Sequence, residues 1–352
     1  MTSRSMSTTI KHSKPTLGIE EESAVLDIFR SGHLARGSVT SKFEQNLADL
    51  IGMPYAVAVN SGLSALHLSL RALGVGKGDR VIIPSLVCEA LLLAVDFCGA
   101  IPIVVDINPE DGNISAGCIR RELNLSNVKA IIVPHMFGCP SNIEEICSLG
   151  IPVIEDCAQS IGATIGDKHV GSFGDLSVFS FYATKMICTG EGGAVLCKTK
   201  ETAGILADLR TYRKRSNYHT RYGYDITDMA SAIGIEQLKK LNGFIQRRKE
   251  IARYYSSVFN KIPWIRTLSN DNSVFYRYIV LTKHRDSIRY DLEQNGIECG
   301  FGVSTVLSTI VHPSCPCAEN FARMSLSLPI YPLLTDSEVK HVVESIVKAG
   351  SI

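Results

Sequence analysis

The sequence predicts an α/β fold, with a mostly parallel seven-stranded sheet covered by helices and a smaller C-terminal α+β domain. Short apolar runs alternate with longer stretches of helical apolar spacing, and several of the runs end in a polar or acidic residue. Continuous apolar runs indicate strands buried on both faces, as in parallel sheets that carry helices on either side. The chain of 352 residues is long for one domain, and typical domain sizes favour two.

The first part of the chain supplies the elements of this sheet. Residues 1–14 are polar, and we expect them to form a flexible start. Helices follow over Gly18–Arg30 and Phe43–Ile51, where apolar residues recur at helical spacing. The first strand begins at Ala56 and leads into a turn that reaches Gly62. The other six strands are expected at Arg80–Pro84, Ile101–Asp106, Ala130–Pro134, Pro152–Glu155, Leu176–Phe181 and Gly193–Cys197.

The rest of the chain predicts a connecting helix and a second domain. Helical spacing from Met229 to about Phe259 predicts a long helix that joins the two domains. A strand at Tyr276–Leu281 and a helix at Ile288–Asn295, ended by Gly296, belong to the smaller domain. We therefore divide the chain into a flexible N-terminus (1–14), a large α/β domain (15–245) and a small α+β domain (246–352).

Composition narrows the class of partner. The 36 basic and 35 acidic side chains give a formal charge of +1, so neither nucleic acid nor an anionic membrane is indicated. No apolar run reaches the roughly 18 residues of a membrane-spanning helix, and the polar N-terminus lacks the apolar core of a secretory signal. We expect a soluble, cytoplasmic protein that acts on small molecules.

The eleven cysteines are odd in number, and many lie in apolar runs, which favours reduced, buried thiols over disulfides. The nearest approach to a metal site combines Cys315 and Cys317 with His312 and Cys299. A Cys-x-Cys pair is tighter than the usual zinc spacing of about two to four intervening residues. We therefore expect no metal.

The stretch from Val153 to Val195 carries the residues of a predicted cofactor site. Asp156 comes at the carboxyl end of a predicted strand, where open α/β sheets bind their ligands, and a second strand carries Ser180 and then Lys185. A lysine just beyond a buried strand can be partly desolvated, which favours the neutral amine that a Schiff base requires. Together these residues describe a pyridoxal phosphate (PLP) site, in which Lys185 holds the aldehyde, Asp156 keeps the pyridine nitrogen protonated and Ser180 binds phosphate.

Each of these residues also has an ordinary structural interpretation. Asp156 alone could cap a helix or form a salt bridge, Lys185 could be a solvated surface lysine, and Ser180 could be a small core residue. His135, at the end of another predicted strand, is either structural or a substrate contact. The combination and spacing of the first three favour the cofactor site.

A second part of the site is the turn from strand to helix at Ser61 and Gly62. A strand that ends in Ser-Gly before a helix presents free backbone amides and the positive end of the helix dipole, which together favour a phosphate.

These motifs resemble those of the sugar aminotransferases of DegT/DnrJ/StrS type, which have the aspartate aminotransferase fold (PLP fold type I). The sequences EDCAQ, GSFGD, FSF, TK and GEGG occur in the family's order with matching gaps, and the likeness covers roughly residues 15–348. The resemblance implies that Asp156 pairs with the pyridine nitrogen and that Gln159 lies near the ring hydroxyl. It also implies that Ser180 binds the phosphate and that Lys185 carries the aldehyde.

The chain departs from the family pattern near the cofactor. Leu63 replaces the threonine that follows Ser61 and Gly62, so Ser64 or the backbone amides would have to bind the phosphate. Cys88 replaces the aromatic residue that stacks on the ring.

A loop that in the family reaches the neighbouring subunit also differs. Gly223 replaces an asparagine that contacts the neighbour's cofactor phosphate, and Asp225 replaces an arginine. We hypothesise that Arg221 or another base of this loop compensates.

The resemblance implies an aminotransferase that moves an amino group from an amino acid, usually glutamate, to a keto sugar, most often nucleotide-linked. Such enzymes serve amino-sugar biosynthesis for surface polysaccharides or secondary metabolites, and a homodimer with active sites at the subunit interface is implied. Two alternatives remain open. One is a PLP-dependent sugar dehydratase, although these carry histidine where this chain has Lys185, and the other is a PLP-binding regulator that does not transaminate.

Overall fold

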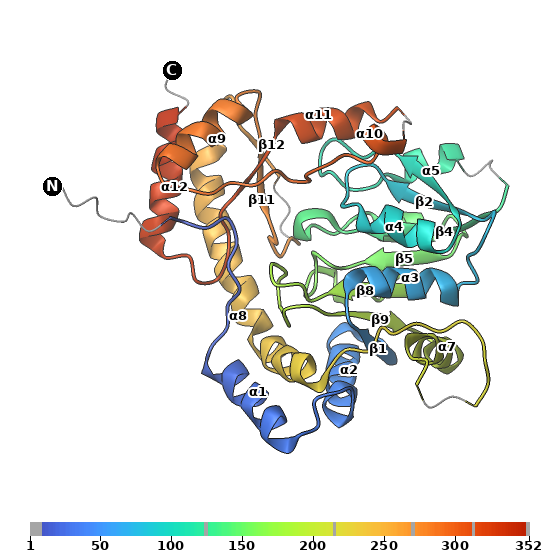
Figure 1. The fold of residues 1–352 in the computed structure, drawn as a ribbon. Coiled ribbons are helices and arrows are strands. Elements are labelled where there is room, and N and C mark those ends of the chain that lie inside the picture. The colour runs from blue at the N-terminus through green and yellow to red at the C-terminus, as the bar shows by residue number, and fades with distance from the viewer. Residues whose placement is uncertain (1–8, 123–125, 214–215, 269–271, 312–313, 350–352) are drawn as a thin grey trace.

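The computed structural model describes the central sheet as seven strands in the order β1-β9-β8-β5-β4-β2-β3 (Figure 1). Strand β9 pairs antiparallel with β1 and with β8, and the other pairs are parallel, which confirms the predicted fold class. The described residues are 9–122, 126–213, 216–268, 272–311 and 314–349. The strands are β1 Tyr55–Val59, β2 Arg80–Pro84, β3 Ile101–Val105, β4 Val128–Pro134, β5 Val153–Asp156, β8 Leu176–Ser180 and β9 Gly193–Cys197.

Helices cover both faces of the sheet because successive residues of its buried strands point to opposite sides. On one face, side chains such as Val81 and Ile83 pack with α3, α4 and α7. On the other face, Ile82 packs with α5 and α6, while Phe179 packs with α2 and α8 (Asp228–Phe259). The first helices are α1 Ile19–Ser31, α2 Ser38–Ile51, α3 Gly62–Ala72, α4 Ala90–Phe97, α5 Ala116–Glu122, α6 Ile143–Cys147 and α7 Lys200–Arg210.

The register of the sheet brings the carboxyl ends of β4, β5 and β8 to one edge. Pro134 lies opposite Asp156, which lies opposite Val178. Ser180, at the end of β8, lies opposite Gly193 of β9. The residues that follow these strands therefore meet in space although they are distant in sequence. Between them lie a 3-10 helix η1, Met136–Gly138, and a small hairpin of β6, Thr164–Ile165, with β7, Lys168–His169.

A single helix, α8 (Asp228–Phe259), connects the sheet to a second core (Figure 1). Its first half packs against α1 and α2, and its second half packs in a cluster with the C-terminal elements. The predicted domain boundary at residue 245 falls inside this helix, so the division into domains stays a prediction. The C-terminal elements are β10 Arg266–Thr267, β11 Tyr278–Leu281, α9 Arg285–Gln294, α10 Ser308–Val311, α11 Pro316–Met324, β12 Ser325–Leu328 and α12 Asp336–Ala349.

The segment around Ile10 differs from the flexible start that we expected for residues 1–14. Ile10 is buried, its N–H donates to Gly296 O at 2.8 Å, and its carbonyl accepts the Glu298 N–H at 2.9 Å. Two residues on, His12 Nε2 is hydrogen-bonded to Ser327 Oγ at 2.9 Å. The apolar side chain of Ile10 joins the second core, which holds this segment in place. None of the described helices is both long and apolar enough to cross a membrane.

Candidate active site

The buried carboxylate of Asp156 lies at the carboxyl end of β5. Its Oδ1 accepts the N–H of Ala158 at 3.0 Å, and the side chain is almost fully buried. Burial raises the pKa of this carboxyl group, while the hydrogen bond from Ala158 and the charge of Lys185 act in the opposite direction. A buried carboxylate of this kind is stabilised by a cationic partner.

Lys185 lies near an aromatic side chain and within electrostatic reach of Asp156. It follows β8 in a short turn, where its N–H donates to Tyr182 O at 2.8 Å. Its half-buried side chain places Nζ 5.2 Å from the centroid of the Tyr276 ring. The structure thus brings together the predicted acid and the predicted lysine.

The N-terminus of α3 forms a cradle of backbone amides. Ser61 caps the helix, because its Oγ accepts the Ser64 N–H at 3.1 Å. The Ser64 hydroxyl accepts from Ser61 Oγ at 2.9 Å and donates to Asn60 Oδ1 at 2.7 Å. Leu63 packs against the apolar cluster on its face of the sheet. The Ser64 hydroxyl is therefore already engaged, and the first-turn amides of Gly62 and Leu63 are the donors that suit an anion.

Two glycines bring this cradle against the ends of β8 and β9. A Cβ on Gly62 would lie 2.9 Å from Ser180 Cβ and 3.2 Å from its Oγ. A Cβ on Gly193 would clash with the carbonyl of Ser61 and would lie 2.8 Å from Gly62 N. Only residues without side chains allow this approach. The Ser180 hydroxyl and the amides of the helix N-terminus consequently lie side by side, as a phosphate group requires.

Gln159 and Cys88 complete the surroundings of Asp156 and Lys185. The Oε1 of Gln159 accepts the Phe137 N–H at 2.8 Å, which fixes the orientation of its side-chain amide. The Cys88 side chain remains open to solvent, yet the protein atoms around it and then the charge of Asp156 raise the pKa of its thiol. Lys185 lowers that pKa, so Cys88 lies within electrostatic reach of both residues.

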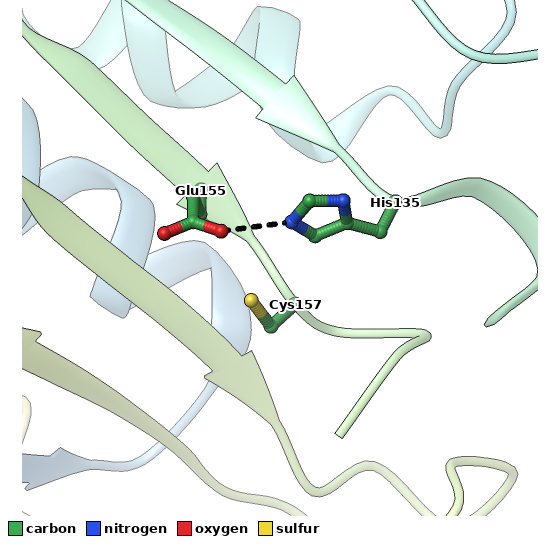
Figure 2. A group of neighbouring side chains, drawn as sticks. All are labelled: His135, Glu155 and Cys157. Atoms are coloured by element: carbon green, nitrogen blue, oxygen red, sulfur yellow. Dashed lines mark hydrogen bonds and ion pairs between the residues drawn. The ribbon is translucent and has the colours of Figure 1, made fainter. Parts of the chain in front are cut away.

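His135 is structural and does not contact solvent. The Ser141 N–H donates to its Nδ1 at 3.0 Å, so Nδ1 carries no proton, and Nε2–H donates to Glu155 Oε2 at 3.0 Å (Figure 2). Glu155 also accepts the N–H groups of Gly171, Phe173 and Gly174 at 2.7 to 2.8 Å. Burial raises the pKa of Glu155, but these hydrogen bonds outweigh it and lower the pKa overall. The interpretation of His135 as a substrate contact is therefore wrong.

The same residues make up a group with metal-ligand atoms. His135, Glu155 and Cys157 offer atoms within 4.8 Å of one another (Figure 2). Both nitrogens of His135 and both oxygens of Glu155 are already used in hydrogen bonds, and burial raises the pKa of the Cys157 thiol well above its usual value. This set favours a hydrogen-bonded pair of imidazole and carboxylate over metal coordination. Of the pattern weighed from the sequence, His312 lies outside the described residues.

The loop expected to reach a neighbouring subunit is tied down within its own chain. Arg221 Nε donates to Asp208 at 3.0 and 3.1 Å, and its other nitrogens donate to Asn217. Asp225 accepts from Arg36 Nε at 2.8 Å, and Gly223 forms an isolated bridge with Thr211. Arg221 is already paired here, which argues against the compensation that we hypothesised.

The sequence did not identify Tyr276 and Arg277 as part of the site. The strand expected from Tyr276 begins only at Tyr278, because the Arg277 N–H donates to Phe137 O and Phe275 has a positive φ of 51°. Tyr276 and Arg277 thus lie in a loop against Lys185. An arginine inside the apolar run VFYRYIVL was the available indication.

The fold and this site define an enzyme of the aminotransferase class. The family model for the DegT/DnrJ/EryC1/StrS aminotransferase family matches residues 15–347, and the chain belongs to this family. The recognition, the fold class and the enzyme class predicted from the sequence are therefore confirmed.

The chain matches curated relatives and a solved structure over nearly its full length. The chain is 33% identical to GDP-perosamine synthase of Escherichia coli O157:H7, over 95% of this chain and 96% of the relative. It is 31% identical to dTDP-3-amino-3,4,6-trideoxy-alpha-D-glucose transaminase of Streptomyces venezuelae, over 96% of this chain and 94% of the relative. The crystal structure of the aminotransferase TlmJ from Streptoalloteichus hindustanus matches this chain with a TM-score of 0.93 at 30% identity. The match covers 97% of this chain and 98% of the TlmJ chain.

Proposed function

We propose that this chain is a PLP-dependent aminotransferase that moves an amino group from L-glutamate to a nucleotide-linked keto-deoxysugar. Two of its curated relatives are named for enzymes of GDP-linked or dTDP-linked amino sugars, which supports such an acceptor. The product would enter the biosynthesis of a surface polysaccharide or a secondary metabolite. The observation that carries the proposal is the placement of Lys185 beside the buried carboxylate of Asp156, at the edge that also holds the amide cradle.

The residues at this edge fit PLP by chemistry and by position. The amides of Gly62 and Leu63 with the Ser180 hydroxyl would hold the phosphate. The hydrogen bond between Ser61 and Ser64 caps the N-terminus of the helix. Asp156 would bind the pyridine nitrogen, since burial without a full charge partner favours a cation beside it.

Three other predicted residues would contact the cofactor in this proposal. Gln159 would present its side-chain amide to the ring hydroxyl, and Lys185 would bind the aldehyde. Cys88, where the family has an aromatic residue, would contact the ring as a small polarizable group.

When bound, PLP accepts the electron pair that the donor's Cα releases as it loses a proton. Lys185 Nζ would move that proton from Cα to the cofactor's C4′ in the first half-reaction, and would move a proton from C4′ to the sugar carbon in the second. Asp156 would maintain the positive charge of the ring nitrogen through both steps. Tyr276 would limit where Nζ can move, because Nζ lies 5.2 Å from the centroid of its ring.

A second copy of the chain completes the site in this proposal. Large apolar side chains are exposed on and around α1, which is unusual for a surface that faces only water. They are Leu17, Ile19, Leu26, Phe29 and Leu34. We infer a cytoplasmic homodimer in which this region contacts the partner, and light scattering should give twice the chain mass of 38.4 kDa.

The proposal is tested by the absorption spectrum of the protein with PLP, before and after glutamate. We expect a visible band that bleaches toward the pyridoxamine form with glutamate and that is absent in Lys185→Ala. Lys340→Ala, which removes an exposed lysine of α12, should behave as the wild type. A band that no amino donor changes would favour the regulator, and the absence of any band would contradict the site.

A further inference from the structure

Two loops hold each other in strained conformations beside Lys185. The Arg277 N–H donates to Phe137 O at 3.2 Å, and a Cβ on Gly138 would lie 2.7 Å from Tyr276 N. Phe137 and Phe275 both have positive φ values, 61° and 51°, which residues other than glycine rarely adopt. Such strain persists only where the surrounding structure fixes it, and it concentrates at ligand sites. The backbone of Tyr276 and Arg277 is therefore held in place.

Tyr276 positions two cations. Lys185 Nζ lies 5.2 Å from the centroid of its ring, and the Arg277 guanidinium lies 4.6 Å from it. Arg277 also donates from Nη2 to the Tyr276 hydroxyl at 3.2 Å. The side chain of Thr184, the residue before the lysine, lies near the same hydroxyl and lowers its pKa. One buried ring thus places a guanidinium close to the turn that carries Lys185.

The charge of Arg277 is not balanced by an acid. In the described part of the chain, no carboxylate lies within ion-pairing distance of this half-buried guanidinium. This charge acts on the neighbouring titratable groups. Burial and then Arg277 lower the pKa of His12 to about 3 and that of Arg248 to about 9. For Tyr276, burial raises the pKa, but Lys185 and Arg277 outweigh it and lower the pKa overall.

The acids closest to this region already have partners. A cavity of about 60 Å³ beside Arg277 is also lined by Glu110 and Asp111. Glu110 Oε2 accepts from Arg266 at 2.8 Å, and Asp111 Oδ1 accepts the Asn113 N–H at 2.9 Å. The guanidinium therefore remains available for an anion that enters from outside the protein.

We propose that Arg277, held by Tyr276, binds a carboxylate of the amino acid donor. A planar guanidinium matches a carboxylate with two parallel hydrogen bonds, and pairing removes the penalty of a half-buried unpaired charge. An amino donor carries its carboxylate on the carbon that loses the proton, so a cation close to Lys185 is well placed to hold it. The inference rests on the proposed function and adds the residue that recognises the donor.

The test is calorimetric binding of 2-oxoglutarate, the keto acid of glutamate, to the PLP-loaded protein. Arg277→Met should raise the Kd about tenfold to a hundredfold, which is the range expected for the loss of a charge-assisted hydrogen bond. Arg277→Lys keeps the charge without the planar fork and should lose less. Arg289→Met is a matched control, because its guanidinium also lies over a ring, 4.7 Å from the centroid of Phe301, but on the outer helix α9.

The outcomes separate this inference from the proposed function. An unchanged Kd in a folded Arg277→Met protein, or no binding of 2-oxoglutarate by the wild type, would overturn it. So would a loss confined to a nucleotide sugar, since that would make Arg277 a phosphate ligand of the acceptor. If Arg277→Met does not fold, the comparison of Arg277→Lys with the wild type decides in the same way. Failure of the proposed function would instead appear as no amino transfer by the wild type from any donor.

Discussion

At the scale of residues, Asp156 depends on the buried pair that precedes it. Glu155 and His135 are both inaccessible to water, and every acceptor and donor of the pair has a defined partner. The proton on His135 is assigned by the backbone, because the Ser141 N–H can only donate. The pair thereby joins the ends of β4 and β5 without bringing a net positive charge near Asp156.

This assignment predicts the effect of replacing His135. His135→Phe leaves one oxygen of the buried Glu155 carboxylate with one donor fewer and the Ser141 N–H without its acceptor. We expect the free energy of unfolding to fall by about 1–3 kcal/mol, measured by denaturant unfolding. His341→Phe, at an exposed position of α12, should change it little. Stabilisation of the wild type by added zinc would contradict the hydrogen-bonded arrangement.

The sequence predicted some site residues well and could not predict others. Asp156 and Lys185 each follow an apolar run, and the structure brings them together because neighbouring strands end at the same edge. Arg277 was hidden inside what resembled a strand. The positive φ of Phe275 and the hydrogen bond to Phe137 depend on a loop more than a hundred residues away, which no local pattern encodes.

At the scale of elements, the junction of α3 with β9 controls the shape of the phosphate cradle. Gly193 lies in the strand next to β8, and its missing side chain admits the backbone of Ser61 and Gly62. The glycines of the GEGG motif thus serve two purposes. Gly190 turns the chain with a φ of 83°, and Gly193 permits the close approach.

Gly193→Ala should therefore damage the cradle. Its Cβ would displace the first turn of α3, so we expect a loss of about 1–3 kcal/mol in unfolding free energy and weaker PLP binding, followed by fluorescence titration. Gly204→Ala is the control. It lies within α7 with no atom near the added methyl, and it should stabilise by about 0.4–1 kcal/mol. Equal PLP affinity in Gly193→Ala and the wild type would argue against the proposed cradle.

The seven strands of the central sheet were predicted within one or two residues because buried parallel strands are continuous apolar runs bounded by polar residues. The predicted beginning of β11 was wrong, because the loop before it is held by Phe137. The prediction of a flexible start was wrong at Ile10, since the burial of Ile10 depends on residues 296–298 near the other end of the chain.

At the scale of the whole molecule, α8 runs from the core on one face of the sheet to the core of the C-terminal elements. Residues in its first half, such as Leu241, join the cluster on one face of the sheet, and Tyr255 joins the cluster of the C-terminal elements. Arg248, between them, is buried and donates to the carbonyls of Phe275, Tyr276 and Ile330. The loop that carries Arg277 is therefore fixed from the helix as well as from the sheet.

Buried histidines make the stability of the whole chain depend on pH. Burial and then Arg71 lower the pKa of His67 to about 4, and its Nε2 has no partner among the described residues. In the unfolded chain the pKa returns to about 6.5, so the unfolded state binds more protons in this window. Stability is fully present above about pH 6.5 and decreases as the pH falls toward 4.

His67→Phe should flatten this part of the profile. Its ring would occupy the aromatic cluster of Phe97, Tyr222 and Tyr224 without taking up a proton. Unfolding free energies measured by denaturant between pH 4 and 7 should decline by roughly 1–3 kcal/mol less than in the wild type. Parallel profiles for the two proteins would show that His67 is not the group that titrates.

The isolated bridge between Ile10 and Ile297 also governs how the protein can be made. Ile10 leaves the ribosome long before Gly296, Glu298 and Ser327, the residues that bind it and His12. The segment around Ile10 therefore stays undocked and accessible to chaperones while most of the chain is translated. Its docking is a late step of folding on the ribosome, after the sheet that forms the active-site edge has been synthesised.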